Sequence, residues 1–231
     1  MKKSNKLIMA GFLLIILVIA ATHIAIYAKY KNGAYTIYNV EDHRTQVPMD
    51  SFPGVRFISV RNLPFAQARF GDIAQAEKGV ENQVLYVRNG DTLIITGKNQ
   101  YNQRISGDRI SLTIPYSATV SFFNSSVILK PGKENSEINT ELHLQRSSAL
   151  FTKSDKLLQF GNMKIIASDS SIATFEGNTH VGSFEVQLLR SAFEYNNGNF
   201  DQLSITTDSV SRISLQTKNL LKARVTTVPG Q

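Results

Sequence analysis

The sequence contains no cysteine among its 231 residues. The chain therefore cannot form disulfides, bind zinc or iron–sulfur clusters through thiolates, use a thiol nucleophile or carry lipid on an N-terminal cysteine. It also has no G-x-x-x-x-G-K or G-x-G-x-x-G phosphate loop, no G-x-S-x-G turn, and no H-x-x-x-H or H-E-x-x-H spacing among its four histidines. We therefore expect a protein that is not an enzyme, with no catalytic residues, no cofactor and no metal.

Acidic residues are missing from the N-terminal part of the chain, where the first is Glu41. Of the 25 basic residues, five are lysines that precede residue 32, so the remaining 200 residues carry 20 basic and 18 acidic side chains. Most of the formal net charge of +7 thus belongs to the first 31 residues. Because the rest of the chain is nearly neutral, the sequence predicts no nucleic-acid-binding face.

A long apolar run occupies residues 7–28, which contain no Asp, Glu, Lys or Arg. As a helix this run would be about 33 Å long, enough to cross a hydrocarbon core of about 30 Å. We therefore expect a single transmembrane anchor in the lipid bilayer, with residues 1–6 as a cytoplasmic tail and the C-terminal part outside. The alternative is a signal peptide cleaved near Ala20, but the run continues past that site, which favours retention.

Strand patterns dominate the chain after residue 30, where no stretch predicts an amphipathic helix of three turns. Residues 29–50 are polar and mixed, and predict a stalk or an edge strand. Short runs rich in β-branched and aromatic residues then recur from residue 51 to residue 228, and Asn89-Gly90 between two of them indicates a tight turn. The ectodomain, residues 51–228, is therefore predicted to be all-β.

A serine followed by a small or aliphatic residue recurs with spacings of 22, 23, 20 and 18 residues, at Ser126, Ser148, Ser171, Ser191 and Ser209. Gly-Asn pairs at 161–162, 177–178 and 198–199 suit corners. One coil of about 20 residues cannot enclose a core, so neighbouring coils must stack at about 4.8 Å per coil. The pattern predicts a β-solenoid, and the alternative is a β-sandwich whose turn spacing resembles a repeat. Whether the serines face inward or outward stays open.

The order of these segments resembles the auto-transporter adhesin head domain family, also called the GIN domain. The resemblance covers about residues 51–228 and rests on the following segments: 57–60, 65–72, 84–87, 89–95, 110–115 and the coils marked by serine. It implies a right-handed parallel β-helix in a bacterial cell-envelope protein, without established catalytic residues. This location would make residues 7–28 an anchor in the inner (cytoplasmic) membrane, with a periplasmic or extracellular C-terminal domain. The chain departs from many relatives, which have more Gly and Asp at the corners and begin with a cleavable signal.

Four residues are candidates for binding. Phe122 and Phe123 are adjacent in a predicted strand, so one of the two rings must point outward, where it could contact a sugar ring or a partner. Lys130 and Lys133 belong to a polar turn that is either a recognition loop or an ordinary connection. Five acidic residues near the C-terminus do not follow the coil spacing, so we expect them to be scattered around the solenoid: Glu176, Glu185, Glu194, Asp201 and Asp208.

Together these features predict a non-enzymatic, membrane-anchored envelope protein whose β-solenoid binds or scaffolds a glycan or an envelope protein, in the manner of an adhesin. The alternative is an anchored component of lipid or lipopolysaccharide transport. That alternative requires an accessible apolar groove where the binding protein would have a filled core.

Overall fold

The computed structural model describes residues 3–31, 47–98, 109–131, 137–152 and 157–228. The chain divides into two compact units, Met1–Gln46 and Val47–Gln231. The first unit contains helix α1 (Lys3–Lys31), which includes the predicted anchor. Within the described part of the chain, no helix combines the length and the apolarity needed to cross a membrane.

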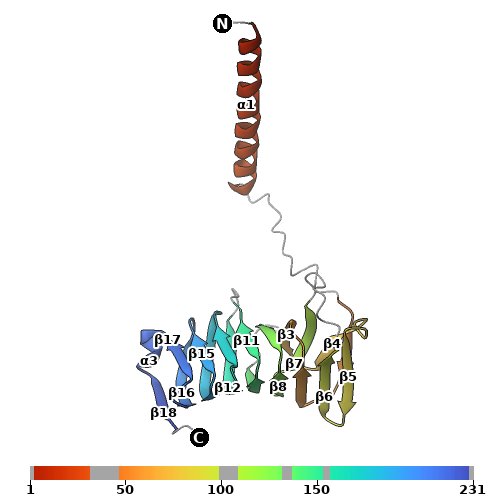
Figure 1. The fold of residues 1–231 in the computed structure, drawn as a ribbon, viewed down its shortest axis with the longest axis vertical. Helices are drawn as coiled ribbons and strands as arrows, with labels where there is room; N and C mark the ends of the chain where they lie inside the picture. Colours follow the sequence, from red (N-terminus) through yellow and green to blue (C-terminus); the bar gives the residue numbers. More distant parts are fainter. Residues whose placement is uncertain (1–2, 32–46, 99–108, 132–136, 153–156, 229–231) are drawn as a thin grey trace. The chain divides into compact units, whose positions relative to one another are not determined.

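The second unit is built from two nine-stranded sheets (Figure 1). Sheet A contains, in order, β1 (Met49–Phe52), β4 (Ala74–Glu77), β7 (Ile110–Pro115), β3 (Ala66–Gly71), β9 (Ser126–Lys130), β11 (Ser148–Phe151), β13 (Ile172–Phe175), β15 (Ala192–Tyr195) and β17 (Arg212–Leu215). Sheet B contains β18 (Ala223–Thr227), β16 (Asn199–Thr207), β14 (Thr179–Leu189), β12 (Leu158–Ser168), β10 (Ile138–Gln145), β8 (Thr119–Phe123), β2 (Phe57–Arg61), β6 (Thr92–Gly97) and β5 (Val84–Asn89). A short helix, α3 (Thr217–Leu220), connects β17 to β18.

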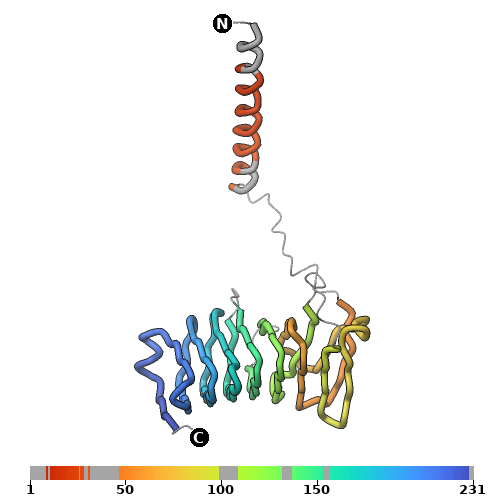
Figure 2. Tube along the Cα trace, in the orientation of Figure 1, coloured from red at the N-terminus to blue at the C-terminus, as the bar shows by residue number. Residues whose placement is uncertain are grey.

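From β8 onward the chain alternates between the two sheets and completes five successive turns, the last formed by β16 and β17. Each strand pairs in parallel with its counterpart one turn later, as β12 does with β14 and β13 does with β15. Figure 2 shows these turns following one another from green to blue. The parallel pairing confirms the predicted β-solenoid and excludes the β-sandwich, whose sheets are antiparallel.

The N-terminal part of this unit is less regular. Strands β2 and β3 lie between the turn of β6 and β7 and the turn of β8 and β9, so the order in space differs from the order in sequence. Strand β5 pairs antiparallel with β6 across a tight turn in which Asn89 faces Thr92 and Gly90 has a φ of 61°. This confirms the turn predicted at Asn89-Gly90. Gly90 and Asp91 are the two central residues of the loop, and a type II′ turn favours glycine at the first of these positions. Residues 49 and 50 begin β1, an edge strand of sheet A.

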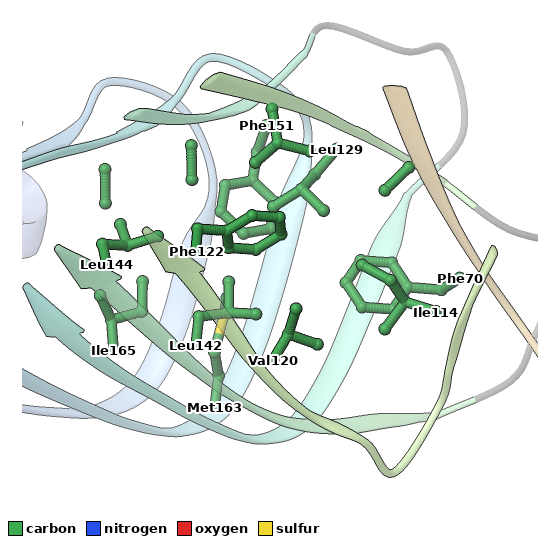
Figure 3. Packing of buried hydrophobic residues seen from close by; sticks show 14 of the residues in the cluster. Phe70, Ile114, Val120, Phe122, Leu129, Leu142, Leu144, Phe151, Met163 and Ile165 are labelled. Atoms are coloured by element: carbon green, nitrogen blue, oxygen red, sulfur yellow. The ribbon is translucent and has the colours of Figure 1, made fainter. Parts of the chain in front are cut away.

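The interior is filled by apolar side chains from both sheets (Figure 3). Alternate strand residues point inward, and aromatic rings stack along the turns: the rings of Phe151 and Phe175 are parallel with centroids 3.9 Å apart. The Tyr195 hydroxyl is also buried, lies 2.9 Å from Thr179 Oγ1 and donates to the Asn199 carbonyl, and burial raises its pKa to about 12. A filled interior gives no support to the lipid-transport alternative, which requires an open apolar groove in place of the core.

A ladder of serines joins the turns, but its register differs from the predicted one. Ser126 and Ser148 are half-buried on the outer face of sheet A, where their Oγ atoms are 2.7 Å apart. The inner ladder consists of Ser125, Ser147, Ser171, Ser191 and Ser211. In it the Ser147 N–H donates to Ser171 Oγ at 3.1 Å, while Ser147 Oγ accepts from the Ser125 N–H at 3.1 Å. Of the predicted serines, Ser126 and Ser148 thus belong to the outer row and Ser171 and Ser191 to the inner ladder. Ser209 belongs to neither, because Ser211 takes the last place in the inner ladder. The adjacent Ser-Ser pairs at 125–126 and 147–148 hide the choice of register.

The predicted Gly-Asn corners are confirmed at two of three places. Gly177 and Gly198 lie in the connections that lead from sheet A back to sheet B, where Gly198 has a φ of 127°. Gly161 and Asn162 instead lie within β12, where the pairing with β10 shifts by one residue. The Gly161-Asn162 pair is thus part of a β-bulge and not a corner.

Candidate functional site

The candidate site lies at the corner where strands of sheet B end and the chain enters sheet A. One residue in each of five neighbouring turns has a φ between 48° and 55°, namely Asn62, Asn124, Arg146, Asp169 and Arg190. Non-glycine residues rarely adopt this conformation, and such residues cluster at functional sites. Here the corner is held by hydrogen bonds between turns, as when the Arg146 N–H donates to the Ser168 carbonyl at 3.3 Å.

Charges of opposite sign alternate along this corner over four turns, in the order Arg146, Asp169, Arg190 and Asp208. Arg190 Nη2 lies 2.5 Å from Asp169 Oδ1, and the Arg190 N–H donates to Asp208 Oδ2 at 2.8 Å. The Gln145 side chain donates to Asp169 at 2.8 Å, and this bond, followed by the Arg190 charge, lowers the pKa of Asp169. The Asp169 carboxylate is thereby fixed between neighbouring turns.

The turn between β12 and β13 has a second left-handed residue, Ser170, with a φ of 67°. Its N–H donates to the Arg190 carbonyl at 2.8 Å. The extra residue makes a hollow lined by Arg146, Asp169, Ser170 and Arg190, which we call the arginine corner. Two successive left-handed residues cost of order 1–3 kcal/mol each, so the surrounding hydrogen bonds must hold them in place.

The two predicted aromatic residues have opposite positions. Phe122 is buried in the core, so its ring is not exposed to a surface ligand, whereas Phe123 is half-buried on the outer face. The Arg146 guanidinium lies over the Phe123 ring, 4.7 Å from its centroid, in a cation–π contact. Phe123 is therefore joined to the arginine corner by Arg146.

The predicted lysines do not belong to this corner. Lys130 ends β9 in sheet A, where it lies opposite Arg69 of β3. Lys133 lies outside the described residues. The structure thus brings one of the four predicted binding residues, Phe123, to the site. The sequence analysis missed Arg146, Asp169 and Arg190. The signal that could have found them is the alternation of Arg and Asp at the spacing of the turns, which no single local motif contains.

A groove continues from the arginine corner toward the C-terminal end of the solenoid, and we call it the corner groove. Its apolar wall includes exposed side chains of Leu189, Val210 and Val228. Its polar wall includes Gln187 and Thr206. The carboxylate of Asp208 holds the loop of this groove, because it accepts from the N–H groups of Ser211 at 2.8 Å and Val210 at 3.3 Å.

The arginine corner and the corner groove form one amphipathic surface that spans several turns. Guanidinium groups, an ordered carboxylate and exposed aliphatic side chains suit contact with an extended partner, and rigid spacing between turns fixes where each group lies. Among the described residues, no three His, Asp or Glu side chains are grouped as a metal site would require. The acidic residues Glu185, Glu194 and Asp201 lie in separate places, paired with Lys164, Arg212 and His180 respectively.

Comparison with known proteins gives little guidance. No family model and no curated protein matches the chain. A crystal structure of a "putative adhesin" from Bacteroides fragilis is 8% identical in sequence, with a TM-score of 0.30, and the match covers 80% of this chain and 97% of that one. Membership of the GIN domain family stays a prediction.

Proposed function

We propose that the protein is a non-enzymatic binding scaffold of the bacterial cell envelope, adhesin-like in function. The proposed anchor in the inner membrane is the apolar run of residues 7–28, and the proposal puts the solenoid on the periplasmic or extracellular side. The observation that supports this proposal is the surface formed by the arginine corner and the corner groove, which we call the corner surface. There exposed side chains recur on successive turns around a filled core. A rigid solenoid can present such a row to an extended glycan or envelope protein.

The alternating charges of the corner support a partner other than nucleic acid. Arg146 and Arg190 are each followed, one turn later, by an aspartate, so the row carries no net positive charge. We also propose a right-handed coil, because parallel strands in one sheet are joined by right-handed crossovers in about 98% of cases.

Affinity capture of the full-length tagged protein from solubilised envelope tests the binding role, with proteins, lipids and glycans identified in the same eluate. We expect a defined protein or glycan, and about tenfold less of it with Phe123→Ala combined with Arg146→Ala, as for a central binding contact. Lys164→Ala, on the outer face of β12, is the matched control and should capture the normal amount. Equal capture by all three proteins, or stoichiometric lipid in the eluate, would contradict the proposal.

Membrane attachment has its own test. After cell breakage and alkaline extraction, the full-length protein should remain with the membrane fraction, and protease added outside the inner membrane should digest residues after 46. Release into the soluble fraction would refute the anchor without affecting the binding experiment.

A further inference from the structure

A second hollow lies at the opposite ends of the sheet B strands, where the chain enters β10, β12, β14 and β16. Its floor is formed by Gly161 and Gly182, which occupy the same bulge position in neighbouring strands. We call it the glycine-floored groove.

The bulge explains the glycines. On β12 the residue at 161 has no partner in β10, whose pairing moves from Ile138 with Phe160 to Asn139 with Asn162. The bulge continues into β14, where a Cβ on Gly182 would lie 2.8 Å from the Gly161 carbonyl oxygen. A Cβ on Gly161 would instead meet side chains only, chiefly the carboxylate of Glu137. The floor therefore has no side chains of its own at 161 and 182, and the Glu137 carboxylate and the Asn139 amide oxygen lie over Gly161. Main chain without a Cβ lets other groups approach it closely.

Polar side chains follow both sides of this floor. Gln159 and His180 are neighbours on one side, and Asn162, Ser183 and Gln202 form a row on the other. The side chains of Gln159, Ser183 and Gln202 are exposed and make no hydrogen bond within the part of the chain that the structure describes. These amide and hydroxyl groups provide both donors and acceptors that a ligand could use.

The charges of the groove limit the class of ligand. Glu137 lies at one end, and Asp201 lies at the other with its Oδ2 3.5 Å from His180 Nε2. Two carboxylates disfavour an anionic ligand, and Phe160, the one aromatic residue of the lining, is only 1% exposed. A ligand rich in uncharged hydroxyls fits this combination, because hydroxyls both donate to carboxylates and exchange hydrogen bonds with amides. The groove extends from Glu137, just before β10, across β12, β14 and β16, or about 14 Å at the usual strand spacing, which is the scale of a short oligosaccharide.

We propose that the glycine-floored groove binds a neutral oligosaccharide. This inference deepens the proposed binding function and rests on it, but it concerns a site separate from the corner surface. A hydroxyl-rich chain lies along the floor, the amides of Gln159 and Gln202 bind it from opposite sides, and Glu137 and Asp201 accept hydrogen bonds from its hydroxyls.

Titration calorimetry of the full-length protein in a sugar-free detergent tests the inference. The probes are chitotetraose, mannotetraose and cellotetraose as neutral chains, and tetragalacturonate as an anionic chain. We expect at least one neutral chain to bind and tetragalacturonate to bind more weakly. Gln159→Ala combined with Gln202→Ala should raise the Kd of the bound chain by about tenfold or more.

Two further variants separate binding from folding. Gly161→Ala adds a methyl group to the floor, and the side chains of Glu137 and Asn139, not main chain, must move to admit it. It should weaken binding and leave the circular dichroism spectrum unchanged. Ser204→Ala, exposed on β16 outside the groove, is the matched control and should bind normally. Absence of binding by all neutral probes, tighter binding of tetragalacturonate, or affinity unchanged in the double variant would overturn the inference. Capture through the corner surface would still stand in each of these cases.

Discussion

The Ser171 hydroxyl shows how a single side chain joins two neighbouring turns. It is fully buried, accepts from the Ser147 N–H of the preceding turn and donates to the Ser168 carbonyl at 2.5 Å. Ser171→Ala would leave the buried Ser147 N–H without a partner, so we expect a loss of about 1–3 kcal/mol in the free energy of unfolding. Urea denaturation measures this loss.

Ser148→Ala is the control for that measurement, because Ser148 faces outward and, among the described residues, its Oγ hydrogen-bonds with Ser126 Oγ alone. It should change the unfolding free energy by about 0.5 kcal/mol or less. Similar losses in the two variants would show that the inner ladder contributes no more than the outer serines.

Asp208 makes stability depend on pH. The hydrogen bond from the Ser211 side chain, then the backbone N–H groups of Arg190, Ser211 and Val210, lower its pKa in the folded state. A lowered folded-state pKa contributes stability above the unfolded value of about 3.9, and this contribution is lost as the pH falls through the folded-state pKa. Melting temperatures below pH 5 should therefore fall less steeply for Asp208→Asn than for the unmodified protein. Parallel curves would mean that Asp208 has no part in the acid transition.

Strand β13 illustrates the two faces of an element. Phe175 points into the core against Phe151, while its neighbour Thr174 is half-buried on the outer face. We expect Phe175→Ala to lower the unfolding free energy by about 3–5 kcal/mol, because a cavity remains in the stack. Thr174→Ala should change it by about 0.5 kcal/mol or less. Guanidinium denaturation compares the two variants, and a small loss for Phe175→Ala would show that the core collapses around the gap.

Strand positions were predictable from sequence, but their pairing was less so. Alternating apolar residues such as Ile110, Leu112 and Ile114 indicate a half-buried strand, and the turn spacing correctly indicated a solenoid. The position of β2 and β3 between later strands could not be predicted. The alternation of apolar residues identifies a strand but does not say which other strands it pairs with. The bulge at Gly161 was missed for a related reason: Gly-Asn suits a corner and a bulge alike.

The candidate site was the least predictable part. Adjacent aromatics in a strand place one ring on each face, and Phe123 is half-buried on the outer face while Phe122 is in the core. The arginine corner, in contrast, brings together residues more than 40 positions apart, from Arg146 to Arg190. They lie side by side only because of the register in which successive turns pair. That register could not be read from the sequence, because either serine of each Ser-Ser pair could belong to the ladder.

At the scale of the whole molecule, the solenoid should be least stable at its ends. Strands β12 and β14 each have two parallel neighbours, whereas β18 pairs only with β16 and its residues are mostly exposed. In repeat proteins each turn is stabilised mainly by its neighbours, and local opening needs less free energy where contacts are few. Amide hydrogen exchange should therefore be slowest in β12 and β14 and fastest in β18. Equal protection in all strands would indicate that the domain opens only as a unit.

The serine ladder also restricts how the protein can change in length. Residues 171–190 make up one complete repeat, so deleting them would bring Ser191 to the place of Ser171, next to the Ser147 N–H, and would lay β15 beside β11 and β16 beside β12. A deletion that does not span whole repeats would break the ladder and misalign the inward-facing rings. Descendants of this gene can therefore lengthen or shorten the solenoid by whole repeats, which would alter the reach of its outer surface while preserving the architecture of each remaining turn.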